Sequence, residues 1–196
     1  MTAKATDRRI QRTRRLLQDA LHAAMIEKGY EATTVRDVID RANVGRSTFY
    51  AHFADKGMLL ASSVEDLRAL LRQKQQDARS ARDGASAEGL GFSLVMLEHA
   101  RGHLQLYHAI VGRVSGTFVT KRIHRVIAEL VYDDLEALDF SGAPARRDLA
   151  AEYVAGAFMA VLTWWLEHGA EQSPQEVDAI FRRLVLYGLT TEPGPS

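Results

Sequence analysis

The stretch that decides the fold is Thr33–Leu60, which reads TTVRDVIDRANVGRSTFYAHFADKGMLL. Thr34 is a good helix N-cap, because its hydroxyl can accept from a free backbone N–H of the first turn. Asp37 stands three residues later, where an acidic side chain completes a capping box. The pattern therefore predicts a short helix over Val35–Ala42.

A tight turn and a second short helix follow. Asn43–Arg46 (NVGR) predicts the turn, because asparagine and glycine tolerate the backbone conformations that turns require. The second helix is expected from Ser47 to His52 or Phe53, with Phe49 and Phe53 one turn apart and facing inward. Two short helices joined in this way are the layout of a helix-turn-helix, whose second helix enters the major groove of DNA.

The second helix has the two faces that groove reading requires, one polar and one apolar. Arg46 suits bidentate hydrogen bonding to guanine, and the methyl group of Thr48 suits contact with a thymine methyl. Thr34, Arg36 and Lys56 are expected to contact phosphate from a helix start, the supporting helix and the next helix start. The predicted DNA-contacting residues are Thr34, Arg36, Arg46, Ser47, Thr48, Tyr50, His52 and Lys56.

The rest of the chain also has the three- and four-residue apolar spacing of amphipathic helices, with no strand pattern and no repeat. About nine helices are expected in an all-α fold. Apart from the two short ones, they cover about 7–28 (ended by Gly29), a long helix capped by Asp55, 88–100, 104–112, 117–138, 147–168 and 174–187. The expected domains are an N-terminal arm with the helix-turn-helix over 1–54, a C-terminal domain over 55–190 and a disordered tail over 191–196.

The formal net charge of zero conceals an asymmetry along the chain. Residues 1–60 hold 11 Lys and Arg against 7 Asp and Glu, and six of the basic residues lie within the first 15 positions. A basic first third followed by an acidic remainder indicates that the N-terminal part meets a polyanion. A short basic arm can also be only a solvated tail, and composition alone leaves both interpretations open.

Several classes of protein are excluded by what the sequence lacks. The 46% of hydrophobic residues excludes a disordered chain, and the absence of cysteine excludes disulfides, cysteine-ligated zinc and a thiol nucleophile, which favours the cytoplasm. No apolar run is judged long enough to span a bilayer, so no membrane association is expected. No nucleophile elbow, phosphate loop or paired-carboxylate signature is present, so neither an enzyme nor a cofactor is predicted. His99 and His103 share a helix face, but the adjacent Glu98 is expected to point away from that face and the chain has no cysteine, so no metal site is predicted.

Thr33–Leu60 closely resembles the DNA-binding signature of the TetR family of transcriptional regulators, and the resemblance extends over about residues 9–65. The form RSTFYxHF is similar to the branch of dihydroxyacetone-kinase-operon regulators, as is Trp164-Trp165-x-x-x-Gly169 followed by SPQEV. The resemblance implies that Arg36, Arg46–Thr48, Tyr50, His52 and Lys56 occupy positions that touch DNA. Tyr50 and Lys56 match positions that usually reach phosphates.

The sequence departs from the family pattern at three positions of this stretch. Asn43 stands where glycine is usual, Ala51 where a larger side chain is common, and Gly57 where an acid is common. Asparagine tolerates the turn, so the fold is not affected. Ala51 puts one DNA contact in doubt.

The resemblance further implies a homodimer formed by the last two helices. Residues 148–168 are apolar on more than one face, as expected of a helix that meets both its own core and a partner. The small residues Ala151, Ala155, Gly156 and Ala160 would allow close approach of helices, as in a four-helix interface. A single fully buried helix in a monomer is the alternative.

A small-molecule effector site in the C-terminal domain is also expected, because this region mixes apolar walls with a few polar groups. The candidate residues are Met96, His99, His103, Tyr107, Arg113, Phe118, Tyr153, Phe158 and Trp164, each of which is equally compatible with a place in the core.

Together these features predict a cytoplasmic, homodimeric repressor that binds a palindromic operator and is relieved or modulated by an unknown small molecule. An alternative is a DNA-binding regulator whose C-terminal domain responds to a partner protein. A small helical enzyme is a third hypothesis, disfavoured because no catalytic constellation is present.

Overall fold

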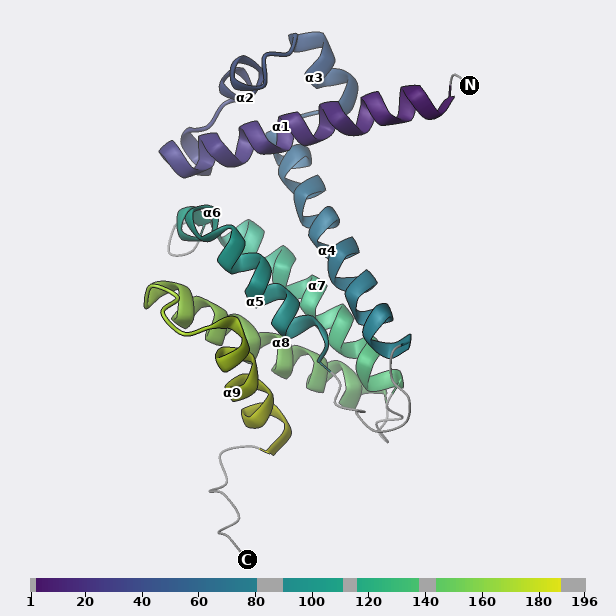
Figure 1. Ribbon diagram of the computed structural model, residues 1–196, viewed down its shortest axis with the longest axis vertical. Helices are drawn as coiled ribbons and strands as arrows, with labels where there is room; N and C mark the ends of the chain where they lie inside the picture. Colours follow the sequence, from purple (N-terminus) through teal and green to yellow (C-terminus); the bar gives the residue numbers. More distant parts are fainter. Residues whose placement is uncertain (1–2, 81–89, 111–115, 138–143, 188–196) are drawn as a thin grey trace, which may run out of the picture. The chain divides into compact units, whose positions relative to one another are not determined.

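The computed structural model describes the backbone of residues 3–80, 90–110, 116–137 and 144–187. These described residues form nine helices and no strand (Figure 1), which confirms the all-α prediction. The helices are α1 (Ala3–Ala32), α2 (Val35–Ala42), α3 (Arg46–His52), α4 (Lys56–Ser80), α5 (Phe92–Gly102), α6 (Leu104–Ile110), α7 (Gly116–Ala137), α8 (Pro144–Glu167) and α9 (Pro174–Tyr187).

The helix bounds differ from the sequence-based expectation mainly at the ends. Helix α1 begins at Ala3 and continues past Gly29, whose φ of 81° and ψ of 161° interrupt the helix before one further turn. Helix α8 begins at Pro144, because proline is tolerated in the first turn of a helix, where its missing N–H has no partner to lose. The tail expected over 191–196 lies outside the described residues.

The chain divides into two compact units. Unit 1 comprises Met1–Ala69 and Gln105–Thr120, and unit 2 comprises Leu70–Leu104 and Lys121–Ser196. In unit 1, α1 packs against α2, and α2 packs against α3 (Figure 1). The buried side chains of this core include Leu17, Leu21, Met25, Val38, Phe49, Phe53, Leu59 and Leu60.

The core of unit 2 is built around three aromatic rings. Phe92 of α5, Phe158 of α8 and Phe181 of α9 meet edge to face, with centroids 5.1–6.5 Å apart. All three side chains are buried, and aromatic pairs favour this geometry because the positive ring edge meets the negative ring face. Helix α9 accordingly packs against both α5 and α8.

Buried polar groups also fix α9 against the start of α5. The Ser93 hydroxyl donates to the Asp178 carboxylate, and the Arg182 guanidinium donates to Asp178 Oδ2 at 2.8 Å and to the Leu90 carbonyl at 2.7 Å. Ser93 and Asp178 are buried, so each polar group finds its partner inside the unit, as buried polar groups must. Ser173 caps the start of α9, since Glu176 N–H donates to Ser173 Oγ at 3.2 Å.

The premise that no segment is long and apolar enough to span a bilayer does not hold for α8. An 18-residue window within Arg146–Glu167 of α8 has a mean hydropathy of 1.4, so by length and composition alone this helix is able to span a bilayer. Within unit 2, however, α8 buries Phe158, Leu162 and Trp165 against protein. A core helix of a soluble protein passes the same test, because its apolar side chains pack against other helices instead of lipid.

Candidate nucleic-acid interface

Helix α2 begins with the capping box that the sequence predicts. Asp37 N–H donates to Thr34 Oγ1 at 3.2 Å, and Thr34 N–H donates to Asp37 Oδ2 at 2.7 Å. Lys28 Nζ lies 2.7 Å from the same carboxylate oxygen. The ammonium of Lys28, followed by the hydrogen bonds from Thr34, holds the pKa of Asp37 well below its usual range. The start of α2 is thus fixed by both hydrogen bonds and charge.

The turn between α2 and α3 is also as predicted. Asn43 adopts the left-handed conformation with φ 51° and ψ 48°, and its N–H donates to the carbonyls of Asp40 and Ile39. Gly45 is the N-cap residue of α3 and provides no side-chain cap. Asparagine therefore fulfils here the role for which glycine is the usual residue.

Helix α3 separates its side chains into two faces. Phe49 and Phe53 are buried with ring centroids 6.2 Å apart, whereas Arg46, Ser47 and Tyr50 are exposed. Ala51 is exposed as well. Thr48 and His52 are partly exposed and flank this outward face. The short helix therefore presents polar groups outward on an aromatic base, as a groove-reading helix requires.

Two side chains of this outward face contact each other. The Arg46 guanidinium lies 5.5 Å from the centroid of the Tyr50 ring, and that ring meets Phe49 edge to face at 5.3 Å. Tyr50 remains 47% exposed. The Arg46 side chain is thus held along the helix surface by a cation–π contact.

One arginine near the N-terminus packs against an aromatic side chain, whereas the other four described there are exposed. Arg8, Arg9, Arg12 and Arg15 are exposed, but Arg14 is half-buried with its guanidinium 4.9 Å from the Phe53 ring centroid. This contact connects α1 to the end of α3. Sequence reasoning missed it, because the two residues are far apart in the chain and nothing in the spacing marks the pair.

The three predicted phosphate contacts lie in different environments. The side chain of Arg36 is 87% exposed and lies 3.6 Å from Asp40, and Thr34 is exposed at the start of α2. Lys56 is only partly exposed, and its ammonium donates to the carbonyls of Tyr30, Glu31 and Thr33 at 2.9, 3.2 and 2.9 Å.

Other contacts within unit 1 hold α4 against α1. Gln18 Nε2 donates to Ser62 Oγ at 3.0 Å and to Asp66 Oδ2 at 2.6 Å, and His22 Nε2 lies 3.1 Å from Ser63 Oγ. These polar pairs gave no signal in the sequence, since each joins positions more than forty residues apart.

The candidate effector residues do not share one environment. Met96 and Phe158 are fully buried in unit 2, and Phe158 belongs to the aromatic cluster. Tyr107 belongs to unit 1 and is buried, and burial raises the pKa of its phenol. Arg113 and the side chain of Phe118 lie outside the described residues.

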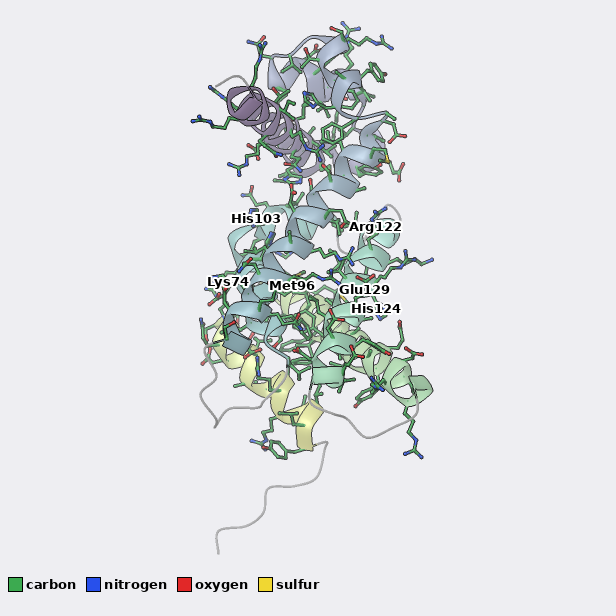
Figure 2. The ribbon with its side chains drawn as sticks, turned by 90° about the vertical axis from the view of Figure 1, so that its right-hand side faces the viewer. Lys74, Met96, His103, Arg122, His124 and Glu129 are labelled. Atoms are coloured by element: carbon green, nitrogen blue, oxygen red, sulfur yellow. The ribbon has the colours of Figure 1, made fainter. Side chains whose placement is uncertain are left out.

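The remaining candidates lie closer to the surface. His103 directly follows α5, about two turns beyond Met96, and both are labelled in Figure 2. His103 is exposed, and its ring stacks on that of His99 at 4.5 Å. Trp164 is 48% exposed and stacks on His168 at 4.7 Å, and Tyr153 is exposed as well. Within the described ranges no three His, Asp or Glu side chains come together as a metal site would require.

Exposed apolar side chains gather on one face of α8 and one face of α9. On α8 they recur at spacings of four and seven residues, and on α9 at three and four, as one stripe on each helix. The members, here called the α8–α9 stripe, are Leu149, Tyr153, Ala160, Trp164, Ile180, Leu184 and Tyr187.

Two of the four small residues expected at the dimer contact lie elsewhere. Ala151 and Ala155 are buried within their own chain, whereas Ala160 is exposed and Gly156 is partly exposed. The expectation for Ala151 and Ala155 is therefore wrong. Helix α8 is apolar around most of its circumference, so the sequence did not reveal which face is turned inward.

Comparison with known proteins agrees with this arrangement. Residues 17–62 match a family described as "Bacterial regulatory proteins, tetR family", and residues 90–187 match one described as "Transcriptional regulator C-terminal region". A relative, "Uncharacterized HTH-type transcriptional regulator YxbF" of Bacillus subtilis (strain 168), is 26% identical over 179 residues. The matched part is 88% of this chain, but the chain spans only 44% of that relative's length.

Solved structures share the fold. A TetR transcriptional regulator from Streptococcus agalactiae 2603V is 25% identical with a TM-score of 0.66, over 94% of this chain and 99% of that one. The "Dihydroxyacetone kinase operon activator DhaS" is 20% identical with a TM-score of 0.60, over 89% and 94%. At this identity the second likeness shows the fold alone, so the assignment to that branch stays a prediction.

Proposed function

Because the chain belongs to the TetR family of bacterial transcriptional regulators, we propose that it is a homodimeric repressor of a palindromic operator in double-stranded DNA. The family consists of regulators and not of enzymes. In this proposal residues 1–54 bind DNA in the cytoplasm, and residues 55–190 dimerise and respond to a small-molecule effector.

The observation that carries the proposal is the two-faced construction of α3. Phe49 and Phe53 anchor the helix, and Arg46 is left exposed at its N-terminal end, where a recognition helix contacts base edges. Arg46 is assigned to a guanine, and Thr48 to a thymine methyl group. Thr34, Arg36, Ser47, Tyr50 and His52 complete the proposed contact surface by meeting phosphates and neighbouring bases.

The α8–α9 stripe supports the dimer. Seven apolar or small side chains left in water on two adjacent helices are costly, and their pairing with the same stripe of a second copy removes them from water. A two-fold interface of this kind pairs two recognition helices, which read two half-sites about one turn of DNA apart. One short helix reads too few bases to select an operator alone.

Effector control is the part of the proposal that depends on the C-terminal domain. A ligand changes DNA affinity only if it binds two conformations of the dimer with different affinity. Met96 is the buried apolar candidate for a pocket wall, and His99 and His103 are the polar candidates at the end of α5. Ligand-induced release of the operator is the expected result.

The test is selection of DNA from a random duplex pool by the purified protein at near-physiological salt. A two-fold-symmetric enriched site is expected, and footprinting on that site then measures release by candidate small molecules. A mixture of weakly bound, salt-sensitive sequences without symmetry would contradict the proposal. Release by a partner protein but by no small molecule would favour the alternative mode of control.

A further inference from the structure

Lys56 is the first residue of α4, and its side chain turns back towards the end of α1. The ammonium donates to three backbone carbonyls, those of Tyr30, Glu31 and Thr33, at 2.9–3.2 Å. It also lies 4.4 Å from the centroid of the Tyr30 ring. The three acceptors match the three protons of the ammonium, which therefore has its hydrogen-bonding capacity filled within the protein.

The place of this charge in α4 is unusual. The N-terminus of a helix carries a partial positive charge, so a lysine there is unfavourable, and the carboxylate of Asp55 at this end is engaged in capping α4, accepting from Met58 N–H at 2.7 Å. The end of α1 is the opposite environment, because its last carbonyls lack helical donors and carry partial negative charge. The favourable partner of Lys56 is therefore α1 and not its own helix.

The three carbonyls lie in the segment 30–33, here called the α1–α2 link, which comprises the last turn of α1 after the break at Gly29 and the residue that follows it. This link begins where Gly29 interrupts α1 and ends at the capping box of Thr34 and Asp37. A side chain that binds Tyr30, Glu31 and Thr33 together fixes the path of the link, and with it the position from which α2 and α3 leave α1.

We propose that Lys56 is a positioning residue that clamps the α1–α2 link and thereby orients the helix-turn-helix, rather than a phosphate contact. The inference rests on the proposed DNA-binding function. Arg36, with its side chain almost wholly in solvent, is the matched cation that keeps the phosphate role.

The two roles predict different salt dependence. A phosphate contact releases counterions, so its loss lowers the slope of log Kd against log salt by about one unit. Loss of a clamp leaves the slope unchanged and weakens binding by about 10- to 100-fold, the effect of removing hydrogen bonds to a charged group. It also lowers the melting temperature of the protein without DNA.

The experiment compares Lys56→Met, which keeps the aliphatic stem but loses the donors, with Arg36→Met. DNA affinity is measured from low to high salt on the selected operator, and melting is followed by circular dichroism. For Lys56→Met we expect an unchanged slope, weaker binding and a lower melting temperature. For Arg36→Met we expect a slope lower by about one unit and an unchanged melting temperature. A slope that falls by about one unit in Lys56→Met overturns the proposal, as does an unchanged melting temperature.

A second variant and a measurement on the protein without DNA test the proposed clamp independently of DNA binding. Lys56→Arg keeps the charge, but a planar guanidinium spreads its donors and is not expected to reach three carbonyls that converge on one nitrogen. Its melting temperature should lie below that of the wild type. A melting temperature equal to that of the wild type would overturn the proposal that Lys56 acts as a clamp. Hydrogen exchange of the amides over 33–38 should accelerate in Lys56→Met, and unchanged exchange also overturns it. Failure of the wild type to select any DNA would instead count against the proposed function.

Discussion

Unit 1 and unit 2 are both helical, but the contacts that bound α2 in unit 1 and those that join three helices in unit 2 span very different distances along the chain. Helix α2 is bounded by hydrogen bonds between close neighbours in sequence, the Thr34–Asp37 box and the left-handed Asn43. Helices α5, α8 and α9 meet through Phe92, Phe158 and Phe181, which come from distant parts of the chain. Local caps set the geometry of a reading surface, whereas a large apolar core determines which helices associate.

The largest effect is expected in the aromatic core. Phe158→Ala should destabilise the protein by about 3–5 kcal/mol, because it removes the ring that contacts both Phe92 and Phe181 and leaves a cavity. Urea unfolding followed by circular dichroism measures this loss. Leu186→Ala is the control, since this leucine lies on α9 but is exposed and outside the stripe. An equal loss of unfolding free energy in both variants would mean that Phe158 contributes no more to the stability of unit 2 than an exposed leucine does.

The next effect concerns the α8–α9 stripe. Ala160→Arg should weaken dimerisation by about 100-fold or more, because an unpaired guanidinium would lose its hydration between two apolar faces. Sedimentation equilibrium measures the change. Ala179→Arg places the same charge at an exposed alanine of α9 outside the stripe and should leave the dimer intact. A dimer that persists in Ala160→Arg but dissociates in Ala179→Arg would mean that the interface lies on another face of the chain.

The contrast between local caps and long-range packing also explains which features could be predicted from the sequence. The bounds of α2 and the conformation of Asn43 were predictable, because caps and turns are encoded within a few residues. The packing of Arg14 on Phe53 was not, and neither was the burial of Ala155 inside its own chain. Both depend on which helices meet in space, and a helix that is apolar on several sides gives no periodic signal for its inner face.

A smaller effect should separate base reading from charge in unit 1. Arg46→Ala should weaken operator binding by about 1–3 kcal/mol and relax selectivity at one base pair, because it removes the side chain proposed to make a bidentate contact to guanine. Competition between operator variants measures it. Arg41→Ala is the control, because Arg41 is a cation of α2 that pairs with Glu27 and lies outside the proposed contact set. Unchanged selectivity in Arg46→Ala would show that α3 is placed on the operator in a different register.

The smallest effect tests the local cap through its charge. Lys28 and the hydrogen bonds of Thr34 lower the pKa of Asp37 in the folded protein, so the unfolded chain binds a proton first as the pH falls. The cap therefore stabilises the protein fully above the ordinary aspartate pKa of about 4 and loses this contribution below it. Asp37→Asn should lower the free energy of unfolding at neutral pH, with a difference from the wild type that shrinks towards pH 3. Urea unfolding over this pH range measures the difference, and Asp40→Asn controls for a carboxylate outside the cap. A difference that stays constant with pH would mean that the shape of the cap, and not its charge, holds the start of α2.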